Sequence, residues 1–332
     1  MCKLSCDPYV QPQAGRSAAW LARRVWDAKV AGSNPAAPIP VVMMPRVAVL
    51  LGAAAAMSFG ALAVAIRIAL RGGVDPEAGS LVTTAVACVL CIAIAAAFGQ
   101  WSHVPWRDTW PFLTTGTVAP GVTQVLFTRA VGLIGPSRTT IVVGAAPALS
   151  AAIAIAFLGE PARTALVIGT LLVVGGGTML AWERGGPRGL LTVGVLLASA
   201  GAVLFAVRDN FVRWAERGNE VPGVVAAACS LATASVVIAA IVFARGDAVM
   251  RTQKAAAPFL LSGLIYGLAY AFLLTAFDHG RVTVVAPLYG TESLWAVVFS
   301  TAVLRRTEAV GVRLAAASLL VVAGGALISG FR

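Results

Sequence analysis

Charged side chains are scarce in this sequence. Asp, Glu, Lys and Arg make up only 12% of its 332 residues, whereas hydrophobic residues make up 59%. A soluble domain has about half of its residues apolar and roughly a quarter charged. No single soluble core of this length can cover so much apolar surface with a polar shell. The composition therefore excludes an ordinary soluble protein and favours an integral membrane protein.

The sequence also lacks the patterns that nucleic-acid binding or catalysis requires. The net charge is +11, but Lys and Arg stand singly or in pairs at the ends of apolar runs, where membrane topology and anionic lipid require them, and they form no basic stripe. The two histidines, His103 and His279, lie between apolar runs, and no HExxH, Gly-x-Ser-x-Gly or paired-carboxylate motif is present. We therefore predict no nucleic-acid partner, no cofactor and no enzymatic activity.

Cysteine is rare as well, and the CxxC pair lies within an apolar segment. Cys88 and Cys91 form a CxxC inside the apolar run 81–98, with no second pair and no histidine nearby. A metal or redox site would need such partners. We interpret both cysteines as small apolar fillers and predict no metal site.

Long apolar runs dominate what remains. A bilayer span needs about 20 mainly apolar residues, and only helices or closed barrels satisfy their backbone in lipid. The runs lack the period-2 alternation of a barrel strand. The sequence therefore predicts an all-α integral membrane protein with ten transmembrane helices, at residues 47–70, 79–98, 110–133, 138–158, 164–182, 190–211, 221–243, 258–277, 282–303 and 309–329.

The chain repeats itself after about 146 residues. Segment 173–180 aligns with 321–328 at an offset of 148, and Glu160 aligns with Glu308 at the same offset. Further matches are Arg67, Arg71, Gly72 and Pro76 with Arg213, Arg217, Gly218 and Pro222 at 146, and Thr139 with Thr283 at 144. We predict two five-helix repeats, 44–185 and 186–332. An odd number of spans forces the second copy to enter the membrane from the opposite side, as in inverted-repeat transporters that work by alternating access.

One stretch resembles a known family. Pro147…Phe157-Leu-Gly-Glu-Pro161, followed by Ile168-Gly169 and the glycines 175–177, is similar to the EamA domain of the drug/metabolite transporter superfamily. The resemblance covers Met44 to the C-terminus, although Leu304-Arg-Arg-Thr-Glu308 replaces the Leu-Gly-Glu-Pro turn in the second copy.

This resemblance implies ten helices, both termini in the cytoplasm, and export or exchange of amino acids, metabolites or drugs across the cell (plasma) membrane. It implies no particular substrate. A lipid flippase of the same fold is the nearest alternative function, and an intramembrane enzyme and a scaffold are more distant ones.

An acidic residue marks the most suggestive candidate site. Glu292 falls about ten residues into the predicted span 282–303, too deep for its short side chain to reach the interface, and a charge there costs about 2.5–3.5 kcal/mol on insertion scales. Tyr289 and Trp295 lie three residues to either side, on roughly the same face. We expect Glu292 to bind substrate or a proton. A neutral glutamate hydrogen-bonded across helices is the alternative.

Other polar residues are placed to join this site. Tyr266 and Tyr270 lie one turn apart beside a Gly263-xxx-Gly267 contact face and would form an aromatic wall, or would need buried partners for their hydroxyls. The span 110–133 carries a polar stripe that either packs helices or lines a cavity: Thr114, Thr117, Gly121, Gln124 and Thr128. Of these residues, Gln124 joins the site prediction.

Three arginines are available as cations for Glu292: Arg67, Arg129 and Arg208. Arg67 and Arg129 lie near span ends, where a long side chain can reach the headgroups, but we include Arg129 in the site. Asp209 and Arg213 are spaced to form a helix-surface pair.

The orientation is a first testable prediction. With residues 1–43 left out, seven basic residues fall on the side of the N-terminus and ten on the other, which leans slightly against a cytoplasmic N-terminus. The family resemblance implies the opposite, and we follow it. A fluorescent protein fused to the C-terminus should therefore be bright. A dark fusion, together with an active phosphatase fused at the same point, would show that the orientation is reversed.

The start of the chain is a second testable prediction. Residues 1–43 differ in composition from the rest and contain no span, although Trp20, Leu21, Val25 and Trp26 would suit an amphipathic arm. Gly32-Ser-Asn-Pro35 can be encoded by GGT TCG AAT CCC, which reads like the T-arm of a transfer-RNA gene. We expect translation to start at Met43 or Met44. The intact mass of the native protein tests this, and a chain beginning before Trp20 would disprove it.

Overall fold

The computed structural model describes residues 44–146, 148–150, 188–215, 221–279, 288–304 and 312–330, with a few isolated positions between 151 and 187 and at 285. Residues 42–332 form one compact unit. The predicted N-terminal extension, Pro147, the Leu-Gly-Glu-Pro turn, and the side chains of Asp209 and Arg213 lie outside the described residues.

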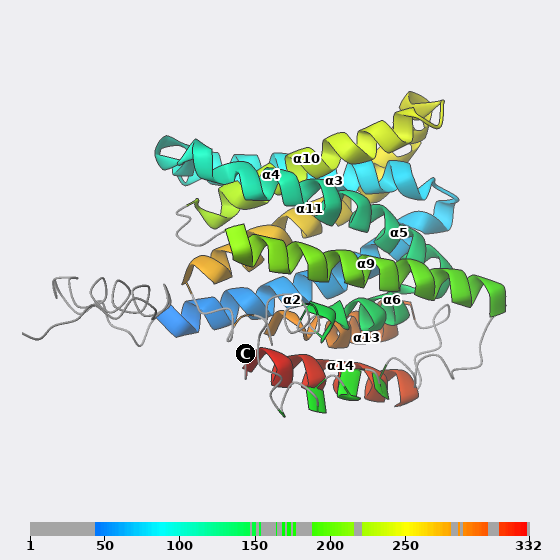
Figure 1. Ribbon diagram of the computed structural model, residues 1–332. Helices are drawn as coiled ribbons and strands as arrows, with labels where there is room; N and C mark the ends of the chain where they lie inside the picture. Colours follow the sequence, from blue (N-terminus) through cyan, green and yellow to red (C-terminus); the bar gives the residue numbers. More distant parts are fainter. Residues whose placement is uncertain are drawn as a thin grey trace, which may run out of the picture. The chain divides into compact units, whose positions relative to one another are not determined.

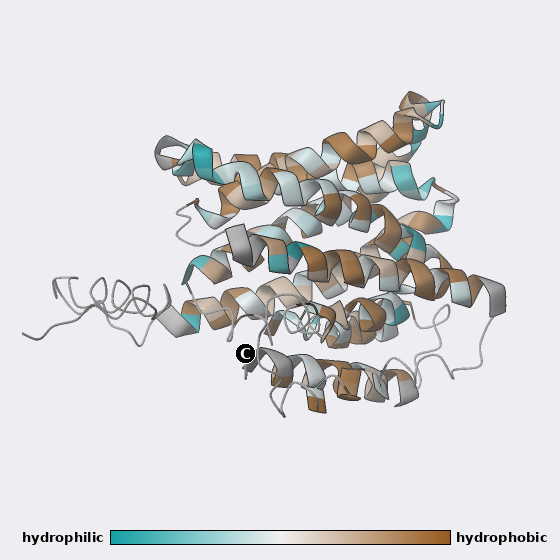
Figure 2. Cartoon of the chain, in the orientation of Figure 1, coloured by the Kyte–Doolittle hydropathy of each residue, from teal (hydrophilic) through white to brown (hydrophobic). Residues whose placement is uncertain are grey.

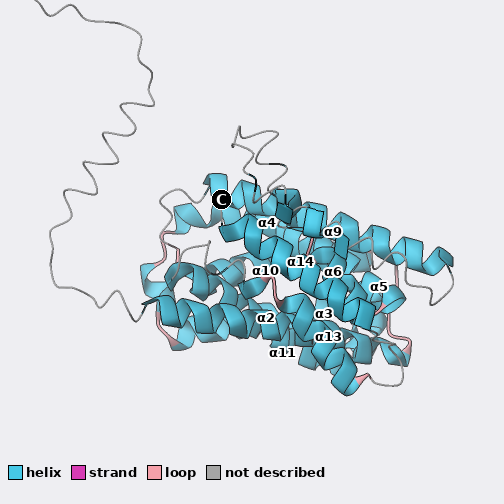
Figure 3. Ribbon diagram, turned by 90° about the horizontal axis from the view of Figure 1, so that it is seen from below, coloured by secondary structure: helices cyan, strands magenta, loops and turns pink. Residues whose placement is uncertain are grey.

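All regular structure in these ranges is helical (Figure 1, Figure 3). The main helices are α2 (Met44–Ala69), α3 (Pro76–Ala97), α4 (Trp110–Gly116), α5 (Thr123–Ile134), α6 (Pro136–Val143), α9 (Arg188–Ala215), α10 (Gly223–Phe243), α11 (Ala248–His279), α13 (Glu292–Val303) and α14 (Val312–Gly330). Short 3-10 helices η1 (Leu70–Gly72), η2 (Gln100–His103) and η3 (Trp106–Thr109) join them.

Six helical segments are long and apolar enough to cross a membrane: Arg46–Gly72, Pro76–Ala97, Trp106–Ile134, Leu190–Arg208, Gly223–Phe243 and Ala248–His279. Two shorter apolar helices, Glu292–Val303 and Leu314–Leu327, add to them. Figure 2 shows apolar residues along the helices and most hydrophilic residues near their ends. The chain is thus a multi-pass helical membrane protein. The count of ten spans stays a prediction, because the span 164–182 lies largely outside the described residues.

The two repeats begin their second long helix with different caps. In the first, Gly73 turns the chain in the left-handed region (φ 69°), and the Asp75 carboxylate accepts a 2.8 Å hydrogen bond from the Ala78 N–H at the start of α3. This is an N-cap followed by proline at the first helical position. In the second, the Gly223 N–H of α10 donates to the carboxylate of Asp278, 2.7 Å away at the end of α11. The second cap therefore comes from another helix.

The α3–α11 seam is built from small residues. A Cβ added to Gly79 would lie 2.3 Å from the Phe259 ring, and one added to Gly263 would lie 2.5 Å from the Cβ of Val86. Across the same seam the hydroxyls of Thr83 and Ser262 are 3.1 Å apart. Small residues let helices in lipid approach closely. The predicted glycine contact face on α11 therefore packs against α3.

A break separates α4 from α5. Residues Thr117–Val122 form a π-helical segment, η4, with Ala119 in an extended conformation (φ −138°, ψ 111°). Pro120 has no N–H to continue the helix. The break splits the predicted polar stripe, so the expectation of one face is wrong. Thr114 and Thr117 are exposed, whereas Gly121, Gln124 and Thr128 are buried.

Two further breaks lie at corresponding places in the repeats. Helix α6 ends at Val143 before a turn at residues 144–145, and α13 begins at Glu292 after a turn at residues 290–291. The two turns are 146 residues apart, like the repeat itself. The second is closed by the Thr291 N–H and hydroxyl, which both donate to the Leu288 carbonyl. The prediction that Glu292 lies ten residues inside a helix is therefore wrong, because this turn places it in the first turn of α13.

The seam gives a testable prediction about stability. Gly263→Ala should lower the free energy of unfolding by about 1–3 kcal/mol, because the new methyl group overpacks α11 against Val86. Gly201→Ala in α9 is the matched control. Its Cβ would meet nothing within 4 Å, so removing a helical glycine there should be neutral or stabilising. Thermal unfolding in detergent measures both. Equal shifts in the two variants would contradict the close α3–α11 contact.

Candidate functional site

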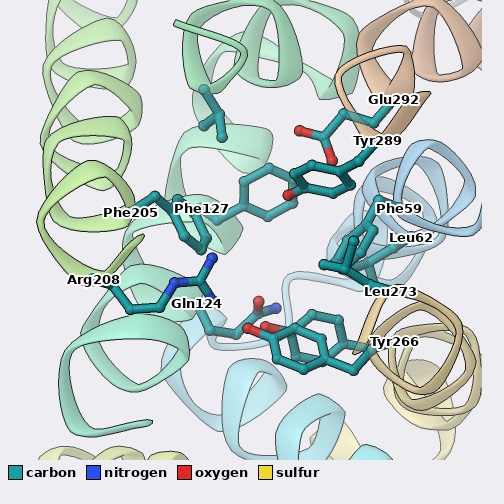
Figure 4. A pocket seen from close by; sticks show the side chains of 12 residues that line it. Phe59, Leu62, Gln124, Phe127, Phe205, Arg208, Tyr266, Leu273, Tyr289 and Glu292 are labelled. Carbon is teal, nitrogen blue, oxygen red and sulfur yellow. The ribbon is translucent and has the colours of Figure 1, made fainter. Parts of the chain in front are cut away.

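A pocket lies where helices of both repeats meet (Figure 4). About 460 Å³ of space that atoms do not fill lies within it, part of which is open to the outside. Its lining comes from α2, α5, α6, α9, α11, α13 and the residues just before α13: Phe59, Leu62, Gln124, Phe127, Val143, Phe205, Arg208, Tyr266, Tyr270, Leu273, Tyr289 and Glu292. To make room for a bound solute, these side chains would have to move apart.

An aromatic cluster forms one wall of the pocket. Phe59 of α2 is in contact with three tyrosine rings, at centroid distances of 6.1 Å to Tyr266, 5.9 Å to Tyr270 and 5.2 Å to Tyr289. Tyr266 and Tyr270 also meet edge to face at 5.0 Å. Such pairs are stabilising beyond the area they bury. The wall thus combines apolar ring faces with phenol hydroxyls.

Packing on two sides positions Glu292. An added Cβ on Gly60 of α2 would lie 2.7 Å from the Ala296 nitrogen, so α13 lies directly against α2. On another side, the Ser318 hydroxyl of α14 donates to the Ser293 hydroxyl at 3.0 Å. Glu292 itself is buried and has Tyr289 as a hydrogen-bond partner. The carboxyl group is therefore held at the pocket by its neighbours.

Arg208 and Gln124 are the other strongly polar groups in the lining. The Arg208 guanidinium carbon lies 5.2 Å from the ring centroid of Phe205, one turn earlier on α9. The Gln124 amide nitrogen is 3.5 Å from the Thr128 hydroxyl on α5. Figure 4 shows the Arg208 guanidinium extending into the pocket beside Gln124.

The structure brings together five of the seven residues of the predicted site. Glu292, Tyr289, Tyr266, Tyr270 and Gln124 line the pocket. Their role in binding stays a prediction.

Trp295 and Arg129 are not in the lining. The Trp295 ring stacks on Phe299, one turn later on α13, at 5.8 Å. Three aromatic lining residues were not predicted from the sequence: Phe59, Phe127 and Phe205. Among them, Phe205 could have been found from the sequence, because it lies three residues before Arg208 and so on the same helix face.

Arg129 belongs to an ionic cluster at the start of α3. It pairs with Glu77, whose side chain is only 2% exposed, and Arg245 contacts the same carboxylate oxygen at 3.0 Å. Arg251 of α11 pairs with Asp75 at 2.6 Å. Burial raises the pKa of Asp75, but the Ala78 N–H and Arg251 outweigh burial and hold this pKa below its usual value. The cluster ties α3, α5 and α11 together at one end of the bundle.

Metal-binding groups are not found in the described part of the chain, where no three His, Cys, Asp or Glu side chains gather. Cys88, Cys91 and Cys229 are buried free thiols there. The Cys91 thiol donates to the Gly267 carbonyl at 3.4 Å, across the α3–α11 seam. This contact agrees with the interpretation of the pair as packing residues.

Comparison with known proteins gives the family. A crystal structure of a protein superposes with a TM-score of 0.60 and 24% sequence identity, over 85% of this chain and 96% of that one. At this identity the likeness shows the fold alone. No curated protein matches the chain. The EamA-like transporter family matches twice, at residues 46–182 and 192–330, which accounts for most of the sequence and confirms the predicted resemblance. The chain belongs to the EamA-like transporter family.

Proposed function

We propose that this protein is a secondary transporter that exports or exchanges a small organic metabolite, amino acid or drug by alternating access. Its location would be the plasma membrane, with both termini in the cytoplasm. The observation that carries the proposal is a pocket lined by side chains from both family matches. Phe59, Gln124 and Phe127 come from the first match, and Arg208 and Tyr266 come from the second.

The position of the pocket favours alternating access. Transporters built from two repeats bind substrate at the repeat interface, where helices are discontinuous. Two such breaks lie beside this pocket. Segment η4 ends at Val122, two residues before Gln124, and α13 begins at Glu292 itself. A small rearrangement of one repeat against the other changes the walls of the pocket, because the two repeats contribute different walls.

Glu292 is the group in the pocket that we propose takes up a proton or a cationic group of the substrate. Ionisable residues inside a membrane are rare and are retained mainly on ion or substrate pathways. Glu292 is buried against aromatic rings, with Tyr289 as its partner. Uptake and release of a proton there would change the charge of the pocket and couple transport to the proton gradient.

Glu292→Gln tests this role. The amide keeps the shape of the side chain and its neutral hydrogen bonding, so the variant should fold and insert normally. Counterflow of labelled solutes in proteoliposomes between about pH 5.5 and 8 should show that the pH dependence is lost. The control is Asp247→Asn in the exposed turn before α11. Asp247 has φ 47°, a conformation that asparagine tolerates.

The outcomes separate the possibilities. If Glu292→Gln transports at the native rate with the native pH dependence, Glu292 is structural. If the native protein exchanges no solute of a broad panel but moves labelled lipid between leaflets, it is a flippase and the proposed function is wrong. If it moves neither, the scaffold alternative replaces transport.

A further inference from the structure

Resting on the proposed function, we infer that the pocket recognises small organic monoanions, in which a carboxylate binds Arg208 and an apolar body lies along the aromatic wall. Arg208 was not part of the predicted site. Its place in the pocket, beside Phe205 and Gln124, carries the inference.

The geometry of Arg208 suits a planar anion. Phe205 lies under the guanidinium, with the ring centroid 5.2 Å from Cζ. This cation–π contact holds the guanidinium over the ring. The N–H groups of a guanidinium point outwards in its own plane, where they match the two oxygens of a carboxylate. Arginine stays charged at every physiological pH, so this end of the pocket attracts an anion throughout the transport cycle.

The Gln124 side chain adds a neutral donor at the same end. It extends from α5, and α5 packs against α9. Figure 4 shows Gln124 next to the Arg208 guanidinium. An amide can donate to a carboxylate oxygen that the guanidinium leaves unbound. A fixed cation and an adjacent neutral donor together make an anion-binding end.

Charge balance favours a monoanion. Among the described lining residues, Arg208 is the cation and Glu292 the carboxyl group. A monoanion adds a single negative charge beside Arg208 and leaves Glu292 able to exchange a proton. A dianion such as phosphate would bring a second negative charge into a poorly solvated pocket, where uncompensated charge is strongly unfavourable.

The rest of the lining sets the shape of the substrate. Arg208 and Glu292 lie on opposite sides of the pocket (Figure 4), on helices α9 and α13 that both pack against α6. Phe127 lies between them, and Phe59 and Leu62 line the side of the pocket that faces Arg208. Apolar and aromatic surfaces of this kind bind the apolar part of a ligand, while a few polar groups fix its orientation. An apolar chain or ring attached to the carboxylate would fill this stretch.

The test uses matched pairs of acids and amides. The probes are butyrate, hexanoate and 3-phenylpropionate, each compared with its primary amide, which has the same shape and no charge. Binding is measured by the rise in melting temperature of the purified protein, and transport by counterflow in proteoliposomes. We expect at least one acid to bind and exchange about ten-fold or more better than its amide.

Two variants of Arg208 make the test specific. Arg208→Lys keeps the charge but loses the planar guanidinium with its paired N–H donors. It should weaken binding of the acid several-fold. Arg208→Gln should abolish the preference for acid over amide. Arg107→Gln, at an exposed arginine of η3 outside the pocket, is the matched control and should behave like the native protein. The melting temperature of each variant without probe shows whether it folds.

The outcomes distinguish this inference from the proposed function. Exchange of neutral or cationic solutes with no acid bound, or an acid preference that survives in Arg208→Gln, overturns the inference and leaves transport standing. Acid binding that depends on Arg208, without exchange of any solute, supports the anion site and contradicts transport. Failure of every acid to bind overturns the inference, and failure to exchange any solute of the broad panel as well overturns both.

Discussion

The burial of a single carboxylate, that of Glu77, organises one end of the bundle. Its side chain is almost fully enclosed and contacts Arg129 and Arg245. An ion taken out of water is strongly destabilised unless opposite charges and hydrogen bonds surround it, and lipid supplies neither. The arginines therefore have to come from the chain, and α5 and the α10–α11 turn have to meet α3 where the carboxylate lies. Two of the helices that line the pocket, α5 and α11, are tied to the start of α3 by this ionic cluster.

The fold was largely predictable where composition alone determines the structure. Segments α2, α3, α10 and α11 coincide with long apolar runs, because the choice between water and lipid depends on average hydropathy and not on individual contacts. The repeat was predictable because it is a property of the sequence. The breaks were harder to predict. Gly290 and Thr291 resemble many small residues elsewhere in the spans, and the turn that displaces Glu292 to a helix start depends on the packing of α13 against α2.

The candidate site was predictable in part for the same reason. Tyr266 and Tyr270 share a helix face by spacing, and the structure keeps that face because α11 is continuous. Arg129 illustrates the limit. Position in the span predicts a cation near the membrane, but its partner Glu77 lies 52 residues away on another helix, and no local pattern joins the two. The aromatic ring of Phe59 reaches the three tyrosines in the same way, through tertiary packing alone.

The unequal caps of α3 and α10 bear on the relative populations of the conformations of such a protein. The first repeat begins α3 with its own Asp75 and the ionic Glu77, whereas Val221 and Gly223 stand at the corresponding positions, and the α10 amide depends on Asp278. The two repeats therefore have a similar sequence pattern, but different contacts stabilise the starts of their second long helices. A symmetric pair would populate its two conformations equally, so that neither side of the membrane is preferred. With the proposed alternating access, the end tied by the Glu77 cluster should open less often, so that the protein favours one conformation even without a gradient.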